Sequence, residues 1–232
     1  MKTNAKIEVA ENYNRSYHNL KYNQGYPGVW HLVMHELVHL DFILEARKAN
    51  SNKLFTSNES HRKAFMDITK PARMKLQKSG RDLNSINGFF ESLFTGMNLQ
   101  IYNTPIDLFI EEKLFNEYPD LRPYQFTSLF YLIGQGIKGT TNKTIINYTP
   151  PGIVQASKLL NLVNALQFRD LYGVDFLNEF QPAHNELDTA ARLYEEFIEY
   201  RDDREPGEEY DLVDHWAKDL KLDKYFSFKE EK

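Results

Sequence analysis

One helical segment constrains the fold of this chain more than any other feature. Residues 29–49 read VWHLVMHELVHLDFILEARKA. A helix built from them carries apolar side chains on almost every side, which predicts that it is buried. Within it, His35 and His39 lie four residues apart, and Glu36 follows the first histidine. The protein interior must therefore provide partners for two imidazoles and a carboxylate, since unpaired polar groups are costly there.

Helical periodicity continues along most of the chain. It predicts further helices over residues 57–79, 85–101, 105–118, 122–136, 151–168, 186–203 and 210–220. Two short extended segments precede the buried helix, KIEVA at residues 6–10 and HNLKYN at residues 18–23. The predicted fold class is α+β and mainly helical, with a small N-terminal β-sheet, the histidine-bearing helix and a C-terminal helical part.

The segment GIKGTTNKTIINYTPPG, residues 136–152, is the strongest candidate for a domain boundary. It is rich in Gly, Thr, Asn and Pro, which interrupt helices and favour turns. It divides the chain into a domain over residues 1–150 and a C-terminal helical subdomain over residues 151–232 that packs on it. The alternative is one continuous domain.

Composition narrows the partners and the ligands. With 28 Lys and Arg against 33 Asp and Glu, the net charge is −5, so neither nucleic acid nor an anionic membrane is expected as a partner. Residues 126–137 are too short to span a bilayer and the start resembles no export signal, so a cytoplasmic location is expected. The oligomeric state stays open. There is no cysteine, so any metal must be held by His, Asp or Glu.

The spacing of the two histidines has a mechanical meaning. Residues four apart lie one turn apart on one face of a helix, so His35 and His39 can give two nitrogens to one metal ion. Glu36 is rotated by about 100° from His35, which puts its carboxylate beside such an ion. Zinc would satisfy this buried set. The alternative is a pair of ordinary core histidines paired with their neighbours.

The HExxH motif formed by HELVH resembles that of the zincin metallopeptidases, over about twenty residues. This resemblance implies a zincin-like domain, Zn2+ as cofactor, a peptide or protein substrate, and hydrolysis by a zinc-activated water with Glu36 as general base. The predicted function is a zinc-dependent metallopeptidase. The alternative is a non-catalytic zincin-like domain that binds zinc or regulates a larger assembly. The metzincin subclass is excluded, because Phe42 and Glu45 replace its Gly and third His.

The chain then resembles the gluzincins, in which a later helix contributes a glutamate. The segment NTPIDLFIEEKLFNEYP predicts a helix that starts at Thr104 and Pro105. Helical projection puts Asp107 and Glu111 inside its apolar stripe, where acids need a partner. We predict Glu111 as the third metal ligand and Asp107 as an acceptor for a histidine N–H beside the metal. Alternatively, Asp107 is an ordinary acid at a helix start.

Other residues compete for the same role. Glu59 follows His39 by twenty residues and is preceded by Asn58, similar to the thermolysin-type Asn-Glu element. Lys63 stands where that element has Asp, and projection puts Glu59 on the solvent side. Glu112 falls on the wetter side of its own helix and is a weaker candidate.

Three more histidines receive other interpretations. His31 lies one turn before His35 on the same side, and we expect a packed histidine there more than a ligand. His61 is expected to be structural. His184 and the tyrosines are candidate oxyanion donors among which the sequence does not choose. The segment HNLKYN is interpreted as an edge strand to which an extended peptide substrate would add.

No residue is assigned to a cofactor other than zinc.

Overall fold

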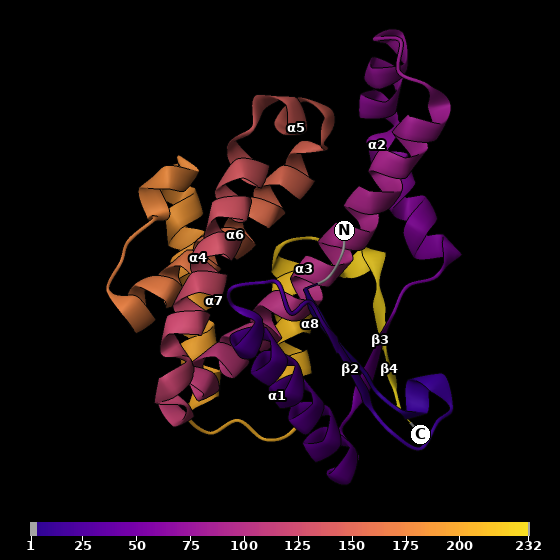
Figure 1. The fold of residues 1–232 in the computed structure, drawn as a ribbon. Coiled ribbons are helices and arrows are strands. Elements are labelled where there is room, and N and C mark those ends of the chain that lie inside the picture. The colour runs from indigo at the N-terminus through magenta and orange to yellow at the C-terminus, as the bar shows by residue number, and fades with distance from the viewer. Residues whose placement is uncertain (1–3, 232) are drawn as a thin grey trace.

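Helices dominate the computed structural model, which describes residues 4–231 (Figure 1). The helices are α1 (Val29–Lys48), α2 (Glu59–Lys78), α3 (Leu83–Glu117), α4 (Arg122–Thr141), α5 (Lys143–Tyr148), α6 (Pro151–Tyr172), α7 (His184–Arg201) and α8 (Glu209–Asp219). The strands are β1 (Ala5–Glu8), β2 (Asn19–Tyr22), β3 (Lys53–Thr56) and β4 (Ser227–Glu230). The predicted mainly helical α+β class is confirmed.

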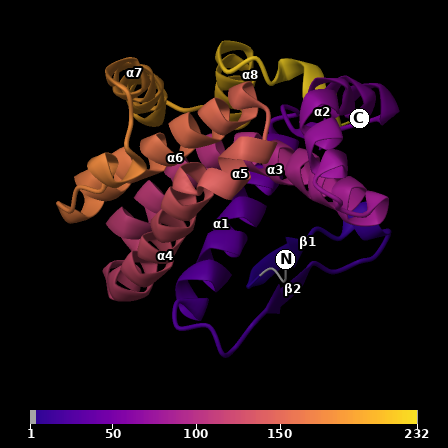
Figure 2. The ribbon, with the colours of Figure 1, turned by 90° about the horizontal axis from the view of Figure 1, so that it is seen from above.

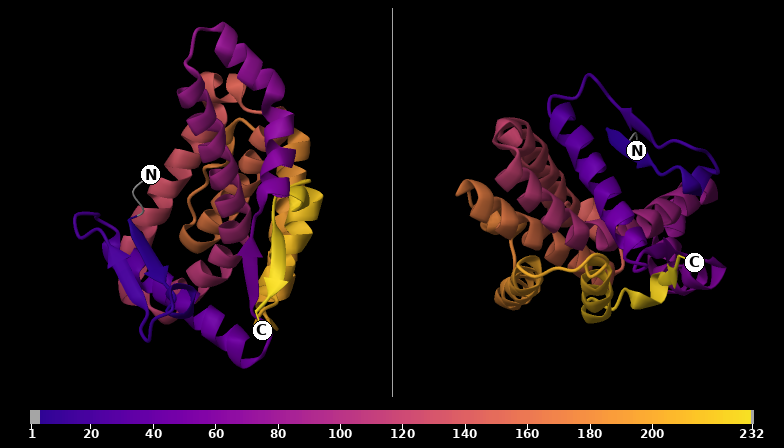
Figure 3. Two further views of the ribbon diagram at one scale, coloured as in Figure 1. Left: turned by 90° about the vertical axis from the view of Figure 1, so that its right-hand side faces the viewer. Right: turned by 90° about the horizontal axis from the view of Figure 1, so that it is seen from below.

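The strands form two separate antiparallel pairs. β1 pairs with β2, with Ile7 opposite Leu20, and this is the predicted N-terminal sheet. β3 pairs with β4, with Phe55 opposite Phe228, so the end of the chain returns to lie beside α1 and α2 (Figure 3). The second pair was not predicted, because it joins segments that are far apart in the sequence.

Helix α1 lies between unlike neighbours. β1 and β2 lie along one side of it and α4 lies along another (Figure 2). Its apolar residues Val38, Phe42 and Ala46 are buried in the central hydrophobic core. Trp30, Leu37 and Leu44 are exposed, so the prediction that this helix is buried on almost every side is wrong. The face of α1 that carries the histidines meets polar groups on α3.

The prediction of two helices over residues 85–101 and 105–118 is wrong, because α3 runs through this region without a break. Thr104 and Pro105 lie inside the helix and not at its start. Proline removes one backbone hydrogen bond, but Ile101, Ile106 and Leu108 are buried on both sides of it and hold the helix together. Asp107 is therefore not an acid at a helix start.

The segment at residues 136–152 is mostly helical. α4 continues to Thr141, α5 follows at once, and α6 begins at Pro151, whose fixed φ suits a first helical turn. One hydrophobic core includes residues of α3, α4, α6, α7 and α8, so the two parts proposed from the sequence share their interior.

None of the helices within residues 4–231 has the length and apolar character needed to cross a membrane.

Candidate metal centre

Two helices face each other through a row of titratable side chains. His31, His35 and His39 recur every fourth residue of α1, and Asp107 and Glu111 are four residues apart on α3. His31 meets Glu111, His35 meets both acids, and His39 meets Asp107. The order of these contacts shows that the two helices run in roughly opposite directions here. The structure thus brings His35, His39, Glu111 and Asp107 together, with His31 beside them.

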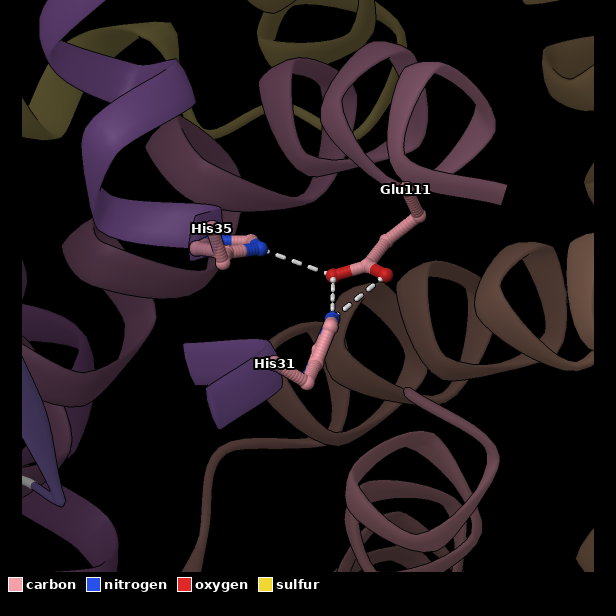
Figure 4. A group of neighbouring side chains, drawn as sticks. All are labelled: His31, His35 and Glu111. Atoms are coloured by element: carbon pink, nitrogen blue, oxygen red, sulfur yellow. Dashed lines mark hydrogen bonds and ion pairs between the residues drawn. The ribbon is translucent and has the colours of Figure 1, made fainter. Parts of the chain in front are cut away.

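Glu111 is closed in by hydrogen-bond donors. Its Oε1 lies 2.7 Å from Nδ1 of His35 and 3.0 Å from Nε2 of His31, which is also 2.8 Å from Oε2 (Figure 4). Gln125 of α4 donates from Nε2 to Oε2 at 2.6 Å and to the Glu111 backbone carbonyl at 2.8 Å. The Glu111 side chain is only 4% exposed. Both carboxylate oxygens are therefore satisfied without a metal ion.

Asp107 is more open and meets different ring atoms. Its Oδ1 lies 3.3 Å from Nε2 of His35 and 3.0 Å from Nε2 of His39. The Asp107 side chain is 27% exposed, against 13% for His35 and 15% for His39. The two Nε2 atoms of the motif and one aspartate oxygen therefore converge beside the more exposed of the two acids.

The charges of this cluster depend on one another. Burial disfavours the charged form of His35, but Asp107 and Glu111 outweigh it and hold the pKa of His35 well above its usual value. Burial likewise opposes ionisation of Asp107, and the neighbouring His35 outweighs it, so the pKa of Asp107 is lowered. The pKa of Glu111 is also lowered, because His31 and His35 outweigh its burial. Both acids are thus held as carboxylates.

The donor atoms fit a divalent metal in two overlapping groups of three. One group is His31, His35 and Glu111, and the other is His35, His39 and Asp107. Two ligand atoms at about 2.0–2.1 Å from a tetrahedral zinc ion lie roughly 3.3 Å apart. The distance from Asp107 Oδ1 to Nε2 of His35 matches that separation, whereas the distance to Nε2 of His39 and those around Glu111 are ordinary hydrogen-bond lengths. The second group is also the more exposed of the two.

Glu36 points to a different neighbour. Its Oε2 accepts a hydrogen bond from the backbone N–H of Ile7 at 2.7 Å. This N–H does not pair with β2, so the edge of β1 that faces away from β2 lies against α1. Within residues 4–231 only one Glu36 oxygen is engaged in this way. Glu36 therefore joins the face of α1 beside the histidines to a strand edge.

The competing acids lie elsewhere. The Glu59 side chain is 80% exposed and pairs with Arg62, so its predicted solvent position is confirmed. Glu112 pairs with Arg201 of α7. These two carboxylates lie outside both groups of candidate metal ligands found within residues 4–231.

The other histidines have separate environments. His61 accepts the backbone N–H of Asn58 and completes the capping box of α2, which confirms its structural interpretation. His184 is 92% exposed and lies near Asp188. His31 is buried as expected, but its partner is the acid Glu111, which the sequence interpretation did not foresee. Gln125 was also missed, since an isolated glutamine on a helix carries no local signal.

Comparison of the chain with protein-family models, with curated proteins and with solved structures found no match in any of the three.

Proposed function

We propose that the protein is a zinc-dependent peptidase in which His35, His39 and Asp107 hold the metal. The observation that carries this proposal is the convergence of the two Nε2 atoms and the Asp107 Oδ1 atom at a partly exposed position. Three protein ligands with an open fourth place are typical of catalytic zinc sites. The HExxH spacing on α1, which packs one face into the core, supports the same conclusion.

This assignment exchanges the roles that the sequence suggested for the two acids. Glu111 uses both oxygens for His31, His35 and Gln125, and it lies on the Nδ1 side of His35. A histidine that binds metal through Nε2 donates its other N–H to a carboxylate or carbonyl, which fixes the orientation of the ring. Glu111 suits this supporting part, and Asp107 suits that of a ligand.

In the proposed reaction, Glu36 is the catalytic residue of this chain. Zinc bound by two histidines and a carboxylate supplies Lewis-acid activation of water and of the substrate carbonyl. Glu36 takes the proton from the attacking water and later delivers it to the leaving amine. The Ile7 N–H holds one oxygen of Glu36 in place, which leaves the second oxygen for proton transfer.

The outer edge of the N-terminal sheet suits an extended peptide. A sheet edge offers main-chain N–H and C=O groups, and a peptide can add to it as a further strand. The sequence interpretation gave this part to HNLKYN, most of which forms β2. The edge of β1 lies against α1 and its Ile7 N–H is taken by Glu36, so we propose the outer edge of β2 as the docking strand and β1 as its support.

The alternative function is a zincin-like domain that binds zinc and performs no hydrolysis. The hydrogen bond between Glu36 and the backbone of Ile7 favours it in one respect, because a carboxylate engaged in supporting β1 needs no catalytic part. Metal binding is common to both proposals. The two proposals differ only in whether Glu36 transfers a proton during hydrolysis.

The test is cleavage of a diverse peptide mixture by wild type and by Glu36→Gln, each shown by elemental analysis to hold one zinc ion. Glutamine keeps the shape and accepts the Ile7 hydrogen bond, but it cannot take a proton. We expect a loss of about 10²–10⁴-fold in rate with zinc content unchanged. Equal cleavage by both proteins would indicate a contaminating protease, and no cleavage by either would favour the non-catalytic alternative. A wild type that takes up no zinc would overturn both.

A further inference from the structure

A buried chain of hydrogen bonds runs from α6 to the candidate metal centre. The Tyr172 hydroxyl lies 2.8 Å from Oε1 of Gln125, Gln125 donates to Glu111, and Glu111 accepts from Nδ1 of His35. Each of these four residues comes from a different helix, α6, α4, α3 and α1 in that order. The chain therefore links the C-terminal helical part directly to the histidine of the HExxH motif.

The direction of each hydrogen bond in this chain is determined by chemistry. Nε2 of Gln125 faces two acceptors, the Glu111 carboxylate and the Glu111 backbone carbonyl, so it must be the amide nitrogen. Oε1 of Gln125 then accepts, and the Tyr172 hydroxyl donates to it. Gln125 is fully buried, so solvent offers it no other partner. Glu111 thus fixes which way the Gln125 amide points, and Tyr172 satisfies the remaining amide oxygen.

We propose that Tyr172, Gln125 and His31 are positioning residues that act on the metal through Glu111 and His35. This inference rests on the proposed zinc site and adds to it the part of the fold that sets its affinity. Held by its other donors, Glu111 accepts a hydrogen bond from the Nδ1–H of His35 and fixes the ring so that Nε2 faces Asp107 and His39. A ring fixed in this way loses less freedom when it binds a metal.

His31 supports this proposal by being an unfavourable choice for packing alone. Its Nε2 donates to Glu111, but its Nδ1 is buried and has no hydrogen-bond partner among residues 4–231. A buried polar atom without a partner destabilises a fold, because its lost hydration is not replaced. The histidine suits this place because its Nε2 reaches both carboxylate oxygens of Glu111, whereas Gln125 reaches only Oε2.

The experiment measures the zinc affinity of the full chain by competition with a chromogenic chelator, and zinc stoichiometry at saturation by elemental analysis. We expect Glu111→Gln and Gln125→Met to weaken zinc binding by about 10–100-fold, as is usual for groups that support metal ligands. Tyr172→Phe should weaken it by a smaller factor. All three should still hold one zinc ion at saturation, whereas Asp107→Asn should not.

Matched controls separate positioning from general damage. Tyr194→Phe removes a hydroxyl that bonds the carboxylate of Asp170, and Glu112→Gln alters the acid next to Glu111 that pairs with Arg201. Neither should change zinc affinity. A double variant of Tyr172→Phe and Gln125→Met should lose less than the two single losses combined, because both act along one chain.

A spectroscopic signature completes the test. In zinc-loaded wild type, the nitrogen NMR shifts of His35 should show a protonated Nδ1 and a metal-bound Nε2, and the Nδ1–H signal should move in Tyr172→Phe but not in Tyr194→Phe. Wild-type zinc affinity in both Gln125→Met and Tyr172→Phe would overturn the inference while leaving the zinc site standing. Loss of the zinc from Glu111→Gln, with retention in Asp107→Asn, would make Glu111 the ligand and overturn it as well. If wild type binds no zinc, the proposed function fails with it.

Discussion

The two ends of α1 are both tied to distant parts of the chain by charged groups, but in different ways. At its end, Arg47 meets Glu231 through two hydrogen bonds, Nε to Oε2 at 2.6 Å and Nη2 to Oε1 at 2.8 Å. Asn52 adds a further donor to Glu231 at 2.6 Å. Earlier in the helix, His31, His35 and His39 meet Asp107 and Glu111.

The two networks differ in how completely their charged groups are paired. The pair of Arg47 and Glu231 matches a fixed cation with a carboxylate in a two-pronged geometry, so it needs nothing further. The histidine row contains more carboxylate charge than permanent cation, and two of its Nε2 atoms face one partly exposed oxygen of Asp107. The first network fastens the chain end. The second network contains the ligand atoms that we propose bind a zinc ion.

The largest expected loss of zinc affinity is at His39. We expect His39→Gln to weaken zinc binding more than any supporting variant, hence by more than about 100-fold, because it removes one of three ligands. His184→Gln is the matched control, since His184 is exposed at the start of α7. Elemental analysis after dialysis against a weak chelator measures both. Retention of zinc by His39→Gln would remove the basis for the site.

The opposite result is expected at the other end of α1. Glu231→Gln should lower the free energy of unfolding by about 1–3 kcal/mol, because it replaces hydrogen bonds between charged groups with weaker ones. Zinc affinity should stay at the wild-type value. Chemical denaturation and the chelator competition, run on the same preparations, give the two quantities. A matching loss of zinc affinity would show that the two networks are coupled through α1.

What the sequence could predict follows the range of the interactions. The 3.6-residue period located α1, the burial of Glu111 and the exposure of Glu59, because these depend on a single helix. The pairing of β3 with β4 depends on segments that the local pattern cannot connect. For the same reason the sequence could not reveal Gln125 or Tyr172 as neighbours of the site.

The choice between Asp107 and Glu111 was equally beyond the sequence. Both acids lie on the same stripe of one helix, so periodicity treats them alike. They differ in which ring nitrogen of His35 they meet, and that depends on how α1 and α3 cross.

The pH dependence of stability tests whether the pair of Arg47 and Glu231 stabilises the fold. Hydrogen bonding to Arg47 outweighs burial and holds the pKa of Glu231 below its usual value of 4.5. A carboxylate with a lowered folded-state pKa contributes stability above its unfolded pKa and loses it as pH falls through the folded value. The stability difference between wild type and Glu231→Gln should therefore be constant near neutral pH and shrink below pH 4.5. Denaturation series at several pH values measure it, and a difference that grows in acid would contradict this account.

The smallest effect is expected at Glu59, which lies in neither network. Its side chain is 80% exposed at the start of α2 and pairs only with Arg62 within residues 4–231, and exposed ion pairs contribute little. Glu59→Gln should therefore leave both zinc affinity and the unfolding transition at their wild-type values. This near-silent variant is informative because Glu59 occupies the place of the thermolysin-type glutamate ligand, twenty residues after His39. If Glu59→Gln lost its zinc while Asp107→Asn kept it, α2 would have to move its first turn against α1 when the metal binds. The contrast drawn between the two ends of α1 would then describe only the metal-free protein.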